Sequence, residues 1–318
     1  ITPIEVASRE TGRNDPRSEP PHPPDPGRGP ETGQPRGPAD PPGSGVTSRV
    51  TLRTLIRARE RGEKFACLTC YDATTARWLE RAGVPVLLVG DTAAEMILGM
   101  PSTIHATMDF MVLLTAAVRR GAPRAFVMGD MPFMSYQADD REALRNAGRF
   151  MTEGMADAVK LEVDRSYASL VERLARAGVP VVAHIGSRPQ LVKLQGGYAA
   201  AGRTVTEAHH VIADAAALEA AGASMLLVEA VPLEVSERIA QRASIPVIGC
   251  GAGPACDGQV VVLQDLLGLT DRQPAFAQPL AFLGDHLVAA ARNWVDRVQR
   301  GELGSHPYRM LDGGLDKG

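Results

Sequence analysis

Short apolar runs that stop on an acidic residue constrain this chain more than any other feature of its sequence. Four such runs lie at residues 86–91, 125–130, 158–162 and 225–229. Continuous apolar runs of this length, bounded by glycine and followed by longer helical stretches, are typical of buried parallel strands. In a closed parallel barrel the C-terminal ends of the strands meet at one opening, where chemistry takes place. Carboxylates at the ends of four strands therefore predict a site for a hard cation.

The composition excludes several classes of function. The 318 residues are 44% hydrophobic and carry a formal net charge of −3, which offers no electrostatic basis for binding nucleic acid or anionic lipid. No apolar run reaches the roughly 20 residues that span a bilayer, so a membrane role is not expected. Four cysteines do not form a disulfide framework in a chain of this size, which favours a soluble protein of the reducing cytoplasm.

Cys67 and Cys70 form a CxxC pair, but they lie inside a strand-like apolar run. A spacing of three in a strand places the two side chains on opposite faces. We therefore interpret these cysteines as packing residues rather than as a zinc or redox pair.

The chain divides into three segments by composition. Twelve of the 24 prolines precede residue 44, among many glycine and charged residues and few apolar ones. Such a segment cannot bury enough surface to offset its chain entropy, so residues 1–48 are predicted to be a disordered extension. Residues 49–306 have a normal length for one catalytic barrel domain, and residues 307–318 are predicted to be a flexible tail.

The order of elements predicts an α/β fold, a (β/α)₈ TIM barrel. Helical stretches, among them residues 75–82, 170–177 and 206–221, separate most of the strands, and the first two of these three end at a glycine followed by Val-Pro. An open doubly wound sheet is the alternative, but no GxGxxG follows the first strand, and the glycine-rich run at 249–253 comes late with different spacing. The eight predicted strands are residues 65–71, 84–91, 124–130, 156–162, 179–185, 223–229, 245–249 and 259–263.

Three acidic residues are candidate metal ligands. Asp91, Asp130 and Glu162 end the second, third and fourth predicted strands, so they become neighbours around the barrel mouth. Three carboxylates at low dielectric repel one another unless a cation lies between them, and all-oxygen ligands favour Mg²⁺. Taken singly, each residue can instead be a solvated strand-end carboxylate or a helix N-cap.

Three further residues face the same mouth. Lys160 lies two residues before Glu162, so both point to the same side of the strand, where Lys160 pairs with Glu162 or with a substrate carboxylate. His184 ends the fifth strand, either as a ligand or as a hydrogen-bonded core residue. Glu229 ends the sixth strand across the barrel, which suits a general acid or base if burial raises its pKa.

Several strings, taken in order, resemble the ketopantoate hydroxymethyltransferase family. The resemblance is collinear from about Thr51 to about His306, and the most specific strings are DMPFMSY at 130–136 and IPVIGCGAG at 245–253. The other matching strings are residues 89–91, 115–123, 159–162 and 196–198.

The resemblance implies a Mg²⁺-dependent barrel of the phosphoenolpyruvate/pyruvate superfamily, usually a homo-oligomer and most often a decamer. It implies transfer of a hydroxymethyl group from 5,10-methylenetetrahydrofolate, the co-substrate, to 3-methyl-2-oxobutanoate. The reaction would pass through a Mg²⁺-stabilised enolate and give 2-dehydropantoate (ketopantoate) in pantothenate and coenzyme A biosynthesis. Two alternatives remain: a C–C lyase or aldolase of the superfamily acting on another 2-oxo acid, and a non-catalytic barrel.

The resemblance also implies a role for each candidate residue. The metal-associated acids fall on Asp91, Asp130 and Glu162. The proton acceptor falls on Glu229, and Lys160 is implied to be catalytic as well as substrate-binding. The substrate-binding positions are Asp91, Thr92, Asp130, Lys160 and the strand-five His184.

The chain departs from the family pattern in loops around the predicted site. Val163-Asp164 replace a Gly-Gly pair after the metal glutamate, Pro101 replaces an aspartate before Ser-Thr, and Ala201 replaces a glutamine. The metal residues are retained, so these changes affect the expected substrate more than the expected fold or metal.

Overall fold

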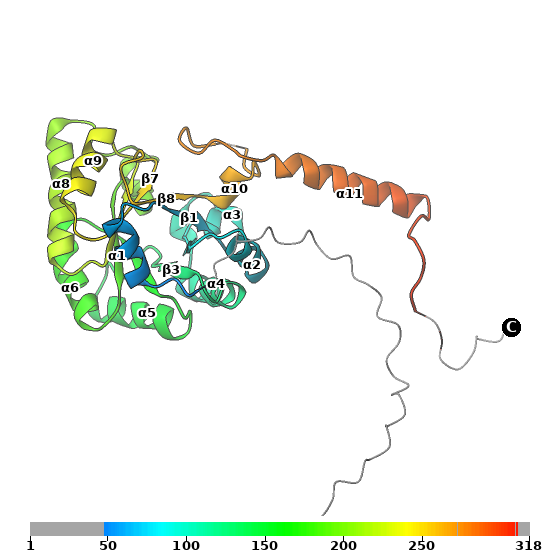
Figure 1. Ribbon diagram of the computed structural model, residues 1–318, viewed down its shortest axis with the longest axis horizontal. Coiled ribbons are helices and arrows are strands. Elements are labelled where there is room, and N and C mark those ends of the chain that lie inside the picture. The colour runs from blue at the N-terminus through cyan, green and yellow to red at the C-terminus, as the bar shows by residue number, and fades with distance from the viewer. Residues whose placement is uncertain (1–47, 272, 309, 311–318) are drawn as a thin grey trace, which may run out of the picture. The chain divides into compact units, whose positions relative to one another are not determined.

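Eight parallel strands form a closed barrel in the computed structural model, which describes residues 48–271, 273–308 and 310. Each strand pairs with the next along the chain, and β8 pairs with β1 (Figure 1). The predicted TIM barrel is confirmed. The strands are β1 (Phe65–Thr69), β2 (Val86–Val89), β3 (Phe126–Asp130), β4 (Ala158–Glu162), β5 (Val181–Gly186), β6 (Met225–Glu229), β7 (Val247–Cys250) and β8 (Gly258–Val261). The predicted disordered extension lies outside the described residues except for residue 48, as does most of the predicted tail.

Most strands are shorter than the apolar runs that predicted them. The runs at 84–91, 179–185 and 245–249 each include a proline. The strands begin one residue after Pro85, Pro180 and Pro246, whose carbonyls accept hydrogen bonds from the neighbouring strands. Proline has no N–H to donate to a ladder, which explains these later starts. The eighth strand was placed at 259–263 but begins at Gly258 and ends at Val261, before the short helix α10 (Leu263–Leu266).

Alternation along each strand separates the core into two layers. Met128, Ala158, Val182 and Leu227 belong to the cluster that fills the barrel. Their strand neighbours Val127, Val159, Ala183 and Val228 belong to the larger cluster that includes helix residues. Successive strand residues point to opposite faces, so polar residues at the inward positions further along the strands must also face the barrel interior.

Helices follow the strands and cover the outside of the barrel (Figure 1). Their starts follow from capping: Asp72 accepts from the Thr74 and Thr75 N–H groups, and Thr51 and Thr204 each form a capping box. The helices of nine residues or more are α1 (Leu52–Glu60), α2 (Ala73–Arg81), α4 (Met108–Gly121), α5 (Asp140–Thr152), α6 (Ala168–Arg176), α8 (Val205–Ala220), α9 (Leu233–Arg242) and α11 (Leu283–Gln299). The short ones besides α10 are α3 (Ala93–Met96), η1 (Thr103–His105), η2 (Arg165–Tyr167), η3 (Pro189–Leu191) and α7 (Val192–Gln195).

Across the part of the chain that the structure describes, no helix combines the length and apolar character needed to cross a membrane.

The last helix, α11, has no buried residue. Leu283, Leu287, Trp294 and Val298 form one exposed apolar line along α11, which we call the α11 stripe.

Candidate functional site

The C-terminal ends of four neighbouring strands bring most of the predicted site residues together. Asp130 is the register partner of Lys160, and Glu162 is the register partner of His184. Glu229 pairs in register with Gly186, two residues after His184. All of these charged and imidazole side chains occupy inward positions of the strand alternation. Asp91 lies two residues after β2, and its backbone N–H donates to Asp130 Oδ2 at 3.0 Å.

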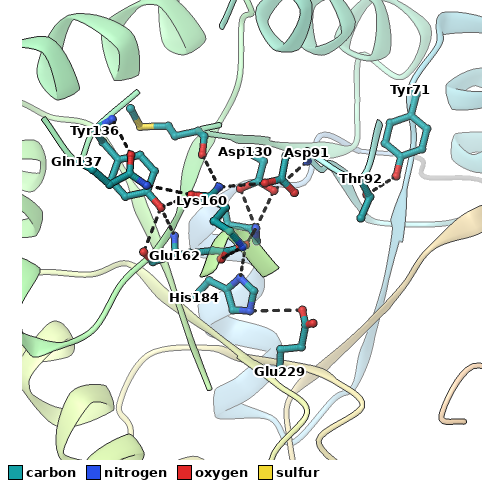
Figure 2. Close-up of polar contacts among 12 residues, drawn as sticks. Tyr71, Asp91, Thr92, Asp130, Tyr136, Gln137, Lys160, Glu162, His184 and Glu229 are labelled. Atoms are coloured by element: carbon teal, nitrogen blue, oxygen red, sulfur yellow. Dashed lines mark hydrogen bonds and ion pairs between the residues drawn. The ribbon is translucent and has the colours of Figure 1, made fainter. Parts of the chain in front are cut away.

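A buried ion pair forms the centre of the site. Lys160 Nζ lies 2.7 Å from both Oδ1 and Oδ2 of Asp130, and 3.9 Å from Glu162 Oε1 (Figure 2). The sequence prediction named Glu162 or a substrate as the partner of Lys160, but its principal partner is Asp130. The reason is the parallel register, which places Asp130 directly beside Lys160 on the neighbouring strand.

The buried side chains of the site include more carboxylates than cationic groups. Asp91, Asp130 and Glu162 are all buried, with the single ammonium of Lys160 among them. Burial raises the pKa of Asp130 and of Glu162, which Lys160 opposes and Asp91 reinforces. Burial disfavours the Lys160 ammonium, but the three carboxylates outweigh it and raise its pKa. With every carboxylate ionised, three negative charges and one positive charge leave an excess of two negative charges.

His184 links this group to Glu229. Its Nδ1 lies 3.8 Å from Glu162 Oε1, and its Nε2 lies 3.4 Å from Glu229 Oε2 (Figure 2). Burial lowers the pKa of His184, and the nearby Lys160 lowers it further, so the neutral imidazole is favoured. Neither ring nitrogen has a hydrogen-bond partner, and the ring is 1% exposed. His184 thus lies between two carboxylates, and its role as a ligand stays a prediction. Glu229 keeps 22% of its side chain exposed and so forms the solvent-facing end of the group.

Thr92 lies beside Asp91, but its hydroxyl is already engaged. The Thr92 and Tyr71 hydroxyls are 2.6 Å apart (Figure 2). The two cysteines of the CxxC pair belong to different core clusters, in agreement with their interpretation as packing residues.

Sequence reasoning missed Gln190 and assigned no role to Tyr136. Gln190 is 3% exposed, and its side-chain amide donates to Asp91 Oδ2 and to the Met131 carbonyl, each at 3.0 Å. The Tyr136 hydroxyl lies 2.8 Å from Gln190 Oε1 and 3.1 Å from the Glu162 backbone N and O. The available signal was the Ser-Arg-Pro-Gln string directly after the fifth strand, which places an amide at the barrel mouth.

Three of the residues that depart from the family pattern line a cavity. Its volume is about 280 Å³, and Val163, Asp164 and Ala201 are among its lining residues. Asp164 accepts a hydrogen bond from Arg188 Nη1 at 2.8 Å and caps η2 through Ser166. Burial acts to raise the pKa of Asp164, but hydrogen bonds from Ser166 and the charge of Arg188 hold it below its ordinary value. Of the pair that replaces the glycines, Asp164 thus adds a charged group to the cavity lining, paired with Arg188.

The carboxylates fit a hard cation that keeps part of its hydration shell. In the described residues no three acidic, histidine or cysteine side chains converge closely enough to enclose a metal ion by themselves. Mg²⁺ is commonly held by one or two carboxylates, with waters and substrate atoms completing its octahedron. Glu162 Oε1 is buried without a hydrogen-bond partner, as expected of an oxygen left for a ligand.

Comparison with known proteins gives consistent matches. A family model described as ketopantoate hydroxymethyltransferase matches residues 49–306. Relatives named 3-methyl-2-oxobutanoate hydroxymethyltransferase include one from Hyperthermus butylicus, 46% identical over 252 residues, covering 79% of this chain and 87% of the relative. A second, from Alkalilimnicola ehrlichii, is 48% identical over 248 residues, covering 78% and 89%.

Solved structures with the same fold come from more distant proteins. A 2,3-dimethylmalate lyase, described as a PEP mutase/isocitrate lyase superfamily member, gives a TM-score of 0.53 at 19% identity, covering 83% of this chain and 93% of that one. A phosphoenolpyruvate phosphomutase from Streptomyces platensis subsp. rosaceus gives 0.55 at 14% identity, covering 79% and 88%. At these identities the likeness concerns the barrel fold alone.

Proposed function

The chain belongs to the ketopantoate hydroxymethyltransferase family, and we propose that its strand-end carboxylates hold Mg²⁺ while 5,10-methylenetetrahydrofolate supplies the hydroxymethyl group. It is an enzyme, a transferase, and its relatives indicate 3-methyl-2-oxobutanoate as acceptor and ketopantoate as product. The observation that carries the metal proposal is the convergence of three buried carboxylates on a single ammonium, where a divalent cation would favour their ionised forms.

Asp91, Asp130 and Glu162 would hold the ion. When bound, Mg²⁺ would act as a Lewis acid that polarises the keto group of the 2-oxo acid and lowers the pKa of its C3 hydrogen. The substrate would lie against Asp91, Thr92, Asp130 and Lys160, with His184 beneath it.

Lys160 would supply a fixed positive charge next to the keto oxygen. Its ammonium is held between Asp130 and Glu162 and is 4% exposed, so it needs no reorientation when negative charge develops on the substrate. In a buried site such a preorganised charge stabilises the transition state more than it would in water.

Glu229 would accept the C3 proton. It lies at the partly exposed end of the group, where a substrate enters, and the neutral His184 ring beside it can donate an N–H to its carboxylate. Glu162 lies near the other ring nitrogen, so His184 has carboxylates on both sides that fix its orientation.

The remaining assignments concern the molecule in the cell. We propose a homo-oligomer, with the decamer that the family resemblance implies, because the α11 stripe exposes apolar side chains along a whole helix. We propose a cytoplasmic location, supported by four cysteines that are all free thiols. We also propose that residues 49–306 form the catalytic domain, since the family model matches that range.

Deuterium uptake at C3 of 3-methyl-2-oxobutanoate in D₂O, followed by proton NMR, tests this function. We expect exchange only with Mg²⁺, and ketopantoate only when methylenetetrahydrofolate is added. Exchange without ketopantoate would contradict the folate donor and favour a lyase or aldolase on another electrophile. No exchange under any condition would contradict the catalytic proposal. Glu229→Gln should abolish exchange, and unchanged exchange would remove Glu229 from the proton-transfer role.

A further inference from the structure

We infer that Gln190 is a positioning residue that aims the carboxylates of Asp91 and Glu162 at the divalent cation. This inference rests on the metal-dependent function proposed above and adds a residue that acts through the ligands. Gln190 lies in η3, outside the barrel strands, yet it contacts the ends of β2, β3 and β4.

Residue 190 makes a hydrogen bond to each of two metal-site carboxylates. Its side-chain Nε2 donates to Asp91 Oδ2 at 3.0 Å, and its backbone N–H donates to Glu162 Oε2 at 2.9 Å. The third carboxylate, Asp130, is oriented separately by Lys160 and by the Asp91 N–H. Two of the three carboxylates therefore depend on one residue for their orientation.

The orientation of the Gln190 amide is itself determined. Its Oε1 lies 2.8 Å from the Tyr136 hydroxyl and 3.1 Å from Gln137 Nε2, which are both donors. Its Nε2 faces two acceptors, Asp91 Oδ2 and the Met131 carbonyl. The reversed amide would place oxygen against both acceptors, so only one orientation satisfies the network.

The hydrogen bonds leave a free oxygen for the ion. Glu162 uses Oε2 for the Gln190 N–H, while its Oε1 is buried without a hydrogen-bond partner. A carboxylate held through one oxygen presents the other at a fixed angle, and such supporting hydrogen bonds typically change metal affinity or activity by about 10- to 100-fold when removed.

Substitution at two glutamines tests the inference. Gln190→Met keeps the side-chain length and the backbone contact to Glu162 but removes the hydrogen bond to Asp91. Gln195→Met is the matched control, because Gln195 is exposed on α7 and lies outside the hydrogen-bond network of Gln190. Mn²⁺ binding to the metal-free proteins would be measured by electron paramagnetic resonance of the free ion.

We expect the Mn²⁺ dissociation constant to rise about 10- to 100-fold in Gln190→Met and less than about threefold in Gln195→Met. In turnover, Gln190→Met should need more Mg²⁺ for half-maximal rate, and its kcat should recover at saturating Mg²⁺. Tyr136→Phe, which removes the hydroxyl that holds Gln190 Oε1, should weaken Mn²⁺ binding in the same direction.

Three results would contradict one or both proposals. If the wild type binds Mn²⁺ and Gln190→Met binds it equally well, the Gln190 side chain has no positioning role, although the metal site stands. If the wild type binds no Mn²⁺, the metal-dependent function fails and this inference fails with it. Should Gln190→Met not fold, an unchanged Mn²⁺ affinity in Tyr136→Phe would equally overturn the inference.

Discussion

At the scale of single residues, the site depends on how buried charges compensate one another. Lys160 carries the positive charge that allows Asp130 and Glu162 to lie close together away from water. Removing one partner of a buried ion pair destabilises the fold by more than the intact pair stabilises it, because the remaining charge stays buried away from water. The same side chains that would bind the substrate are thus part of the stability of the metal-free fold.

Lys160→Met is expected to destabilise the metal-free protein. Three buried carboxylates would lose their ammonium, at a cost of about 3–5 kcal/mol in the free energy of unfolding. Urea denaturation in the presence of a chelator measures this loss. Lys193→Met, at an exposed lysine of α7, is the control and should change stability by less than about 0.5 kcal/mol. A loss below about 1 kcal/mol in Lys160→Met would show that the carboxylates are neutral in the folded state.

His184 should make the folded state sensitive to acid. Because burial lowers its pKa, the unfolded chain takes up this proton first as the pH falls. The contribution of the neutral ring is therefore present above its ordinary pKa of about 6.5 and is lost as the pH falls toward the lowered value. His184→Asn removes this pH-dependent contribution to stability, so the drop in Tm between about pH 7.5 and pH 5 should be smaller than in the wild type. An equal drop in both proteins would contradict the assignment.

At the scale of secondary-structure elements, the strand ends and the short helices that follow them build the site. Gly186 ends β5 with a φ of 90°, which bends the chain away beside β6. A Cβ at this position would lie 2.4 Å from the Glu229 carbonyl oxygen. The turn continues into η3, where Pro189 occupies the first turn and Gln190 reaches back toward Asp91.

Gly186→Ala is expected to displace the end of β6. The residue must adopt a left-handed backbone conformation and also avoid the Glu229 carbonyl, so its cost should exceed the about 1–3 kcal/mol of positive-φ strain alone. Gly178→Ala is the matched control, because Gly178 has a φ of 83° and a Cβ there meets nothing within 4 Å. Thermal unfolding measures both, and kcat should fall only in Gly186→Ala. Equal Tm values for the two variants would refute the steric argument.

At the scale of the whole molecule, the barrel encloses its own apolar core while α11 does not contribute a buried side chain. The two core clusters include residues from all eight strands, and the larger includes residues of most of the helices. By contrast, Leu287 and Trp294 of α11 are 65% and 57% exposed. We propose that this apolar line is the surface through which copies of the chain associate.

Leu287→Asp is expected to weaken self-association. A charge in the α11 stripe would have to be desolvated in an interface, which typically costs several kcal/mol unless the charge is paired. Size-exclusion chromatography with light scattering measures the assembly at micromolar concentration. Arg292→Ala, on the opposite side of α11, should leave the mass unchanged. A wild-type monomer, or a Leu287→Asp oligomer of unchanged size, would contradict a role for this stripe in assembly.

The sequence by itself determined the architecture and most of the site. Apolar runs, glycine stops and acidic run ends predict eight parallel strands, and the two-residue period predicts that Lys160 and Glu162 share a face. These signals are local, because a strand's alternation and a helix's cap depend on neighbours within a few residues. The same strings carry the family resemblance, which the comparisons confirm. The disordered extension and the role of each site residue remain predictions.

Only the tertiary structure decided which side chains meet across strands. The barrel register places Asp130 beside Lys160, so the ion pair forms there, with Glu162 as the more distant partner. It also brings Gln190 to Asp91, although 99 positions separate them in the chain. No local pattern encodes such pairs, because they depend on closure of the barrel and on a turn that folds η3 back over the strand ends. Sequence periodicity determines which way a side chain points, while packing over long sequence distances determines what it contacts.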